Sequence, residues 1–167
     1  MSWLVIDGYN IINCWPEFED VRLEDMALAR VKLIEIMKDF TPLVWDRITI
    51  VFDAYRTRGK GSLEESARGL DVVYTAEGQT ADVYIERMVA TMADIEDMEV
   101  ASSDYLEQRL VLWKGGRRIS AKELRFRLQE VRHTLKREGY LDITTRSLLD
   151  ERLSEHVKKT LENWRRQ

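Results

Sequence analysis

The sequence of 167 residues contains one cysteine, Cys14, and two histidines, His133 and His156. A single cysteine excludes an internal disulfide bond and a cysteine-based zinc site, and it suits a reducing compartment. Two histidines in basic segments, away from the acidic motifs, argue against histidine acid–base or zinc chemistry. The chain also lacks an apolar run of the ~20 residues that span a bilayer, and its start has no leader pattern. We therefore expect a cytoplasmic protein with no membrane partner.

Two common catalytic signatures are also missing. The chain has neither the G-x-S-x-G elbow of serine hydrolases nor a Walker loop that would cradle phosphates. Hydrophobic residues make up 44% and charged residues 34% of the chain. This balance and length are typical of one globular domain with a terminal extension.

Charge is unevenly distributed along the chain, whose net charge is −4. Residues 1–111 contain 11 Lys and Arg against 22 Asp and Glu, and residues 112–167 contain 15 against 8. The first part therefore carries −11 and the last part +7. An acidic site repels a polyanion, so an enzyme that acts on nucleic acid through such a site needs positive surface elsewhere. The simpler alternative is that the basic residues only solvate amphipathic helices.

The hydrophobic pattern predicts an α/β fold. We expect strands at residues 3–6, 47–52, 70–74 and 99–102, and helices at 24–40, 80–93, about 104–111, 120–138 and about 147–165. The polar, glycine-bearing stretch 56–69 is expected to be an exposed loop. Ser120 and Glu123 have the spacing of a capping box that begins a basic helix. This order of elements favours a central, mostly parallel sheet of about four or five strands flanked by helices.

Four aspartates stand where a predicted strand ends or the next helix begins. They are Asp7, Asp53, Asp82 and Asp104. The carboxyl ends of parallel strands share one edge of the sheet, where such folds bind ligands. Several carboxylates meeting without a matching base suit a hard cation such as Mg²⁺ or Mn²⁺. This pattern predicts phosphoester hydrolysis, in which a carboxylate-held metal activates water.

The first two motifs also have ordinary structural explanations. Asp7 and Gly8 could form a turn, with Asn10 capping the segment after it. Alternatively, Gly8 could let a ligand approach the backbone, while Asn10 adds an amide oxygen to a cation. Asp53 has the same two interpretations.

The later motifs leave similar alternatives open. Asp82 and Glu86 share one helix face, where Asp82 would suit the positive end of the helix and Glu86 a solvated surface. Asp104 could be a first-turn acid that follows the caps Ser102 and Ser103. If there were no functional site, each of the four motifs would need its own structural explanation. Their joint placement at strand ends therefore favours a shared functional site.

Four segments together resemble a known family. They are Asp7 to Ile12, Val51 to Ala54, Thr80 to Glu86 and Ala101 to Tyr105, and in this order and spacing they resemble the signature of NYN-domain proteins. NYN proteins are a PIN-like superfamily of metal-dependent ribonucleases. The resemblance is closer to the YacP-like bacterial branch, which includes a ribosome-associated endoribonuclease that cuts mRNA in the ribosomal A site. Residues 120–124 and 164–166 look like the C-terminal helices of that branch.

The resemblance implies a PIN-like, three-layer α/β fold. A catalytic domain at residues 1–118 would be followed by a basic helical extension at 119–167, packed on the same domain. The implied function is metal-dependent cleavage of mRNA, with the ribosome as a further partner. Two alternatives remain, a PIN-like protein that binds RNA or the ribosome without cleaving and a small-molecule phosphohydrolase.

The same resemblance implies roles for individual site residues. The catalytic residues would be Asp7, Asp53, Asp82 and Asp104, of which Asp7, Asp82 and Asp104 would bind Mg²⁺ or Mn²⁺. Asn10, Glu86 and Ser103 would support them. The basic residues that could contact RNA phosphates are Arg56, Arg58, Lys60, Lys114, Arg117, Arg118, Lys122 and Arg125. Tyr9, Tyr55 and Tyr105 lie near site acids and could stack on an unpaired base, although aromatic residues at sheet ends more often pack in the core.

Overall fold

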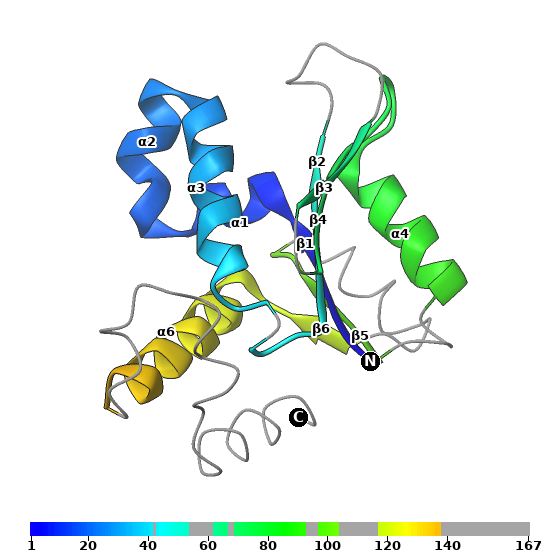
Figure 1. Ribbon diagram of the computed structural model, residues 1–167. Helices are drawn as coiled ribbons and strands as arrows, with labels where there is room; N and C mark the ends of the chain where they lie inside the picture. The colour runs from blue at the N-terminus through cyan, green and yellow to red at the C-terminus, as the bar shows by residue number, and fades with distance from the viewer. Residues whose placement is uncertain (42, 54–61, 67–68, 93–96, 104–116, 138–167) are drawn as a thin grey trace.

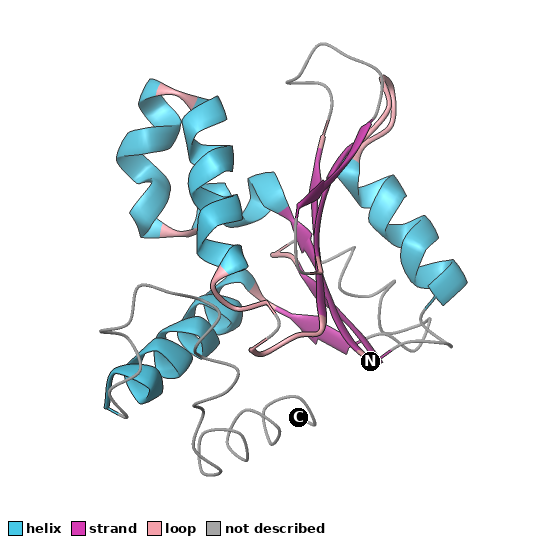
Figure 2. Cartoon of the chain, viewed as in Figure 1, coloured by secondary structure: helices cyan, strands magenta, loops and turns pink. Residues whose placement is uncertain are grey.

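The computed structural model describes residues 1–41, 43–53, 62–66, 69–92, 97–103 and 117–137. Its six strands are β1 (Ser2–Asp7), β2 (Arg47–Phe52), β3 (Ser62–Ser66), β4 (Leu70–Tyr74), β5 (Asp97–Ala101) and β6 (Arg117–Ile119). They form one sheet in the order β3-β4-β2-β1-β5-β6 (Figures 1 and 2). Five strands are parallel to one another, and β3 pairs antiparallel with β4 at one edge. The mostly parallel sheet predicted from the sequence is confirmed.

Helices cover both faces of this sheet. They are α1 (Gly8–Cys14), the 3₁₀ turn η1 (Pro16–Phe18), α2 (Glu19–Glu24), α3 (Met26–Lys38), α4 (Ala81–Met92) and α6 (Ala121–Arg137). Figure 1 shows α4 on one side of the sheet and α1, α3 and α6 on the other. Buried side chains form two separate clusters, one on each face. The chain therefore has the three-layer α/β architecture.

Alternation along β1 explains why both faces need a cover. Leu4 and Ile6 point into the cluster beneath α1, α3 and α6, whereas Trp3 and Val5 point into the cluster beneath α4. All four are buried. Successive side chains of a strand face opposite sides of its sheet, so an apolar run without polar interruptions is stable only when both sides are dry.

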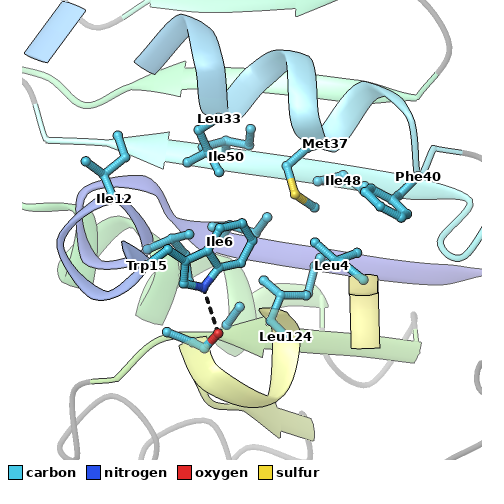
Figure 3. Close-up of a cluster of buried hydrophobic side chains, with 14 of the residues drawn as sticks. Leu4, Ile6, Ile12, Trp15, Leu33, Met37, Phe40, Ile48, Ile50 and Leu124 are labelled. Carbon is cyan, nitrogen blue, oxygen red and sulfur yellow. Dashed lines mark hydrogen bonds between the residues drawn. The ribbon is translucent and has the colours of Figure 1, made fainter. Parts of the chain in front are cut away.

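Helix α6 is part of the same core as the start of the chain. Its buried residues, among them Leu124, Leu128 and Val131, belong to the cluster that contains Leu4 and Ile6. The indole Nε1 of Trp15 donates a buried hydrogen bond of 2.7 Å to the carbonyl oxygen of Ala121 (Figure 3). The proposed boundary at residue 118 falls within β6, and the described residues beyond it pack directly on the sheet.

The strands expected at 3–6, 47–52, 70–74 and 99–102 are present, as are the helices expected at 24–40, 80–93 and 120–138. The prediction of a loop at 56–69 is wrong at Ser62–Ser66, which forms β3. The polar composition of that segment suits an edge strand, which needs no apolar alternation on two buried faces. The helices expected at 104–111 and 147–165 lie outside the described residues.

Besides the short 3₁₀ turn η1, three further elements were not expected from the pattern. Helix α1 begins directly after β1 with a glycine, so it has no polar linker before it. Helix α2 has no buried residue, and β6 is a three-residue strand with two arginines. Short elements of this kind obtain their stability from tertiary contacts, which hydrophobic periodicity cannot report.

Candidate functional site

Three of the four aspartates meet at the carboxyl edge of the sheet. Asp7 ends β1, Asp53 follows β2, and Asp82 lies in the first turn of α4, the helix that follows β4. All three line one cavity of about 470 Å³. In Figure 1, α1 and α4 both begin near the upper ends of the strands that precede them. The structure thus brings together residues that lie up to 75 positions apart in the sequence.

Asp7 has a structural role and a place in the cavity at once. Its Oδ1 accepts a hydrogen bond of 3.1 Å from the main-chain N–H of Asn10, which caps the N-terminus of α1. Burial raises the pKa of the Asp7 carboxyl to about 6, and the nearby charges of Asp82 and Asp53 add to the increase. The capping and site interpretations of Asp7 are therefore compatible.

Asp82 is positioned by the cap of α4. The Thr80 hydroxyl accepts a hydrogen bond of 3.3 Å from the main-chain N–H of Val83, and both Thr80 and Asp82 line the cavity. Glu86 lies one turn further along, is exposed, and is not among the lining residues. The shared helix face thus places Asp82 at the cavity and Glu86 beyond its edge.

Asn10 connects the cavity to the end of β5. Its side-chain Oδ1 accepts a hydrogen bond of 2.9 Å from the main-chain N–H of Ser103. The Cys14 thiol lies 3.3 Å from the Ser103 hydroxyl and 3.9 Å from the same Asn10 oxygen. The amide oxygen that could serve a cation is therefore already an acceptor within the protein. Asp104, the next residue, lies outside the described part of the chain, and its role stays a prediction.

Gly8 is explained by packing. A Cβ atom at this position would lie 2.3 Å from the Phe52 ring, which is far inside van der Waals contact. The ring of Tyr9 packs edge-on against Phe52 at 5.2 Å, and Tyr9 is only 8% exposed. Gly8 is thus needed because the Phe52 ring packs closely against it. Tyr9 is mainly a core residue that also contributes to the lining of the cavity.

The cavity has the donor chemistry of a hard-cation site. Its described lining contains three carboxylates and the amides Asn10, Asn13 and Gln79, with no basic side chain. Oxygen donors of this kind suit Mg²⁺ and Mn²⁺. Among the described residues, no three acidic, histidine or cysteine side chains are close enough together to bind one ion directly. The fit is therefore to an ion that retains several waters, as Mg²⁺ usually does.

Asn13 and Gln79 were missed in the sequence. Asn13 lies three positions after Asn10, and the two share a face of α1. The shared face can be recognised only when residues 8–14 are known to form a helix. Gln79 lies in the turn between β4 and α4, where its main-chain oxygen accepts a hydrogen bond of 2.7 Å from Thr75.

The predicted RNA-binding residues fall into three groups. Arg117 pairs with Asp97 at 2.9 Å, and Arg125 pairs with Glu17 at 2.7 Å. Arg118 and Lys122 are exposed. The third group lies outside the described residues and consists of Arg56, Arg58, Lys60 and Lys114. RNA contact by any of the eight remains a prediction.

A mostly parallel sheet with helices on both faces and three aspartates at its carboxyl edge agrees with the PIN-like architecture that the sequence resemblance implies. The chain belongs to the YacP-like NYN domain family, whose model matches residues 4–166. NYN domains are nuclease-like.

The described residues contain no helix with the length and apolar character needed to cross a membrane.

Known relatives agree with this assignment. YacP of Bacillus subtilis strain 168 is 33% identical over 167 residues, covering 99% of this chain and 98% of its own. A crystal structure of Rae1 (YacP) from Bacillus subtilis has a TM-score of 0.70 and 32% identity, covering 99% of this chain and 95% of that one. The structure of a single-substitution mutant of Rae1 has a TM-score of 0.72 and 27% identity, covering 98% and 99%. Fold and family are thereby shown along nearly the whole chain.

Proposed function

We propose that the protein is a divalent-metal-dependent endoribonuclease that cleaves mRNA. The observation that carries this proposal is the convergence of Asp7, Asp53 and Asp82 on one cavity. Burial of the Asp7 carboxylate is unfavourable and raises its pKa, and the nearby charges of Asp82 and Asp53 add to this cost. Groups held in an unfavourable electrostatic state are typical of functional sites rather than of packing.

A divalent cation would offset this cost. Asp7 and Asp82, with Asp53 and the predicted Asp104, would hold Mg²⁺ or Mn²⁺, partly through water. The ion supplies Lewis acidity, a lowered pKa for water and stabilisation of the charge that develops on a phosphodiester. The carboxylates would orient the ion and the attacking water, and the hydrogen bond between Ser103 and Asn10 attaches the segment after β5 to α1.

RNA is a better candidate than a small phosphate ester. The cavity of about 470 Å³ is large enough for a nucleotide, and its amides can hydrogen-bond to ribose or base. Residues 112–167 carry a net charge of +7, which could bind the phosphate backbone that the carboxylates repel. A small-molecule phosphohydrolase would have little use for that segment.

Association with the ribosome is a further part of the proposal. Its support is the resemblance to the YacP-like branch, which includes a ribosome-associated nuclease. An mRNA positioned by a ribosome would need few sequence-specific contacts with the nuclease itself. A cavity lined by carboxylates and amides, with no basic side chain among its described lining residues, suits such a substrate.

One cleavage assay tests metal dependence and ribosome association together. Purified protein is incubated with an mRNA, free or on translating ribosomes, with Mg²⁺, with Mn²⁺ or with EDTA. Asp82→Asn should reduce the cleavage rate at least a hundredfold, and EDTA should abolish cleavage. Asp20→Asn is the matched control, because it makes the same chemical change at an exposed residue of α2.

The possible outcomes separate the three functions. Metal-dependent cuts that Asp82→Asn removes would support the proposal, and cuts only in the ribosomal sample would add the partner. RNA binding without cleavage in any sample would favour the non-cleaving protein. Hydrolysis of a small phosphate ester, with no effect on RNA, would favour the phosphohydrolase.

A further inference from the structure

Two arginines donate hydrogen bonds to residues that line the cavity. Neither arginine was among the residues expected to contact RNA. Nη1 of Arg22 in α2 donates to the main-chain oxygen of Asn13 at 2.8 Å and lies 3.5 Å from its Oδ1. Nη1 of Arg30 in α3 donates to the Tyr9 hydroxyl at 2.9 Å. Tyr9 and Asn13 both line the cavity. Two guanidinium groups therefore stand beside it.

These two contacts follow one face of α1. Tyr9 and Asn13 are four positions apart, which places them on the same side of the helix with a rise of about 6 Å between them. Neither arginine lines the cavity itself. Both are half-buried and still reach solvent. Arg22 and Arg30 thus each place a positive charge near the rim of a cavity lined by carboxylates.

The partners of Arg22 and Arg30 are neutral, unlike those of several other arginines. Arg47, Arg125 and Arg127 each pair with a carboxylate, at 2.6, 2.7 and 2.7 Å. Within the described residues, no carboxylate lies within ion-pair distance of Arg22 or Arg30. A guanidinium has five N–H donors, so one or two neutral acceptors leave most of its hydrogen-bonding capacity and all of its charge available.

We propose that Arg22 and Arg30 bind phosphate groups of single-stranded RNA next to the phosphodiester at the acidic centre, and thereby position the strand across the cavity. This inference rests on the proposed function. Arginine suits the role because its planar fork matches two phosphate oxygens, and its charge survives partial burial. The contacts to Tyr9 and Asn13 pre-orient both side chains, which reduces the entropy lost when a phosphate binds.

The competing explanation is that both arginines only attach α2 and α3 to α1. The two roles differ in salt dependence. Each phosphate contact releases counterions, so the logarithm of the binding constant falls with the logarithm of salt concentration by about 0.7 per contact on a single strand. A purely structural contact within the protein has no such effect.

The test measures binding of a short, end-labelled single-stranded RNA by fluorescence anisotropy in Mg²⁺, at several salt concentrations. The background is Asp82→Asn, which prevents the proposed cleavage. Arg22→Gln and Arg30→Gln should each weaken binding about 3- to 10-fold and lower the salt slope by about 0.7. Lys38→Gln, the same loss of charge on α3 at a residue paired with Glu35, should leave affinity and slope unchanged.

Lysine variants keep the test decisive if a glutamine variant fails to fold. Arg22→Lys and Arg30→Lys preserve the charge and should retain the slope, with circular dichroism confirming the fold. If the folded arginine variants bind RNA like Lys38→Gln, or if the lysine variants lose the slope, the inference is wrong. RNA cleavage by the unmodified protein would then leave the proposed function intact. If the protein neither binds nor cleaves RNA, the function fails and the inference fails with it.

Discussion

The main-chain N–H of Ser103 donates a 2.9 Å hydrogen bond to Oδ1 of Asn10, 93 positions earlier in the chain. The main-chain N–H of Asn10 in turn donates to Asp7 at 3.1 Å. These two bonds join the end of β1, the first turn of α1 and the end of β5. Asn10 therefore links the first turn of α1 both to the end of β1 and to the segment that follows β5.

Asn10→Ala should slow RNA cleavage clearly while lowering the stability of the fold only a little. The substitution removes one acceptor, so the free energy of unfolding should fall by about 1 kcal/mol. The cleavage rate should fall about tenfold, because the segment after β5, which leads to Asp104, loses its attachment to α1. Single-turnover cleavage and denaturant unfolding measure the two effects. Cys14→Ala is the control, because it removes only weak thiol contacts to Asn10 and Ser103 and should change neither the cleavage rate nor the stability. Normal cleavage by the Asn10→Ala protein would contradict the linking role of Asn10.

Asp7→Asn should stabilise the metal-free protein at neutral pH. The pKa of Asp7 is raised from 3.8 to about 6 on folding, so ionisation is less favourable in the folded state. Below pH 3.8 both states are protonated and Asp7 costs nothing. Between about pH 4 and 6 the unfolded state releases its proton first, and stability falls as pH rises. Above about pH 6 the full cost of about 3 kcal/mol remains.

Asparagine removes this charge but keeps an oxygen that can cap α1. In EDTA, the gain in free energy of unfolding for Asp7→Asn should be near zero at about pH 3.5 and should rise to roughly 2–3 kcal/mol at about pH 7. Urea titrations across this range measure it. The control Asp20→Asn should show no such pH-dependent gain. A gain that is equal at all pH values would show that burial of the charge is not its cause.

A divalent cation should stabilise the unmodified protein, and chelation should remove the effect. Binding to the folded state alone at about 100 times Kd adds about 2.7 kcal/mol. Protons compete for Asp7, so the rise in Tm with Mg²⁺ or Mn²⁺ should be larger at about pH 7.5 than at about pH 5.5. The comparison uses NaCl at matched ionic strength. An equal rise in Asp82→Asn would place the cation somewhere other than this cavity.

Gly8→Ala should disturb the start of α1. The added methyl group would collide with the buried Phe52 ring, and overpacking of this kind costs about 1–3 kcal/mol. Phe52→Leu in the same chain should recover part of the loss, because leucine lacks Cε1 and Cζ, two of the three ring atoms nearest to the added methyl group. A double-mutant cycle by thermal unfolding measures the coupling. Strictly additive effects of the two substitutions would show that the collision is relieved elsewhere.

The sequence predicted the sheet and the position of three site aspartates for the same physical reason. A buried parallel strand is apolar along its whole length, so β1 and β2 are conspicuous, and Asp7 and Asp53 mark where they end. Helix α4 has apolar residues at helical spacing, which located Asp82. Asn13 could not be found in this way, because α1 is short and is stabilised by contacts with distant parts of the chain.

The same limit applies to charge. Counting basic residues directed attention to residues 112–167, but Arg125 is engaged with Glu17 in the structure. Arg22 and Arg30 lie in the acidic part of the chain, where their charge is hidden in the net total. The role proposed for these two arginines rests on their neutral partners on α1, and composition alone does not reveal such partners.

The bond between Trp15 and Ala121 has a consequence for biosynthesis. The helix that carries Asn10 rests on a helix made more than 100 residues later, so a nascent chain cannot complete this layer until α6 has left the ribosomal exit tunnel. Chains halted before residue 121 should be cut by a protease within residues 8–38, whereas chains halted with α6 fully exposed should resist.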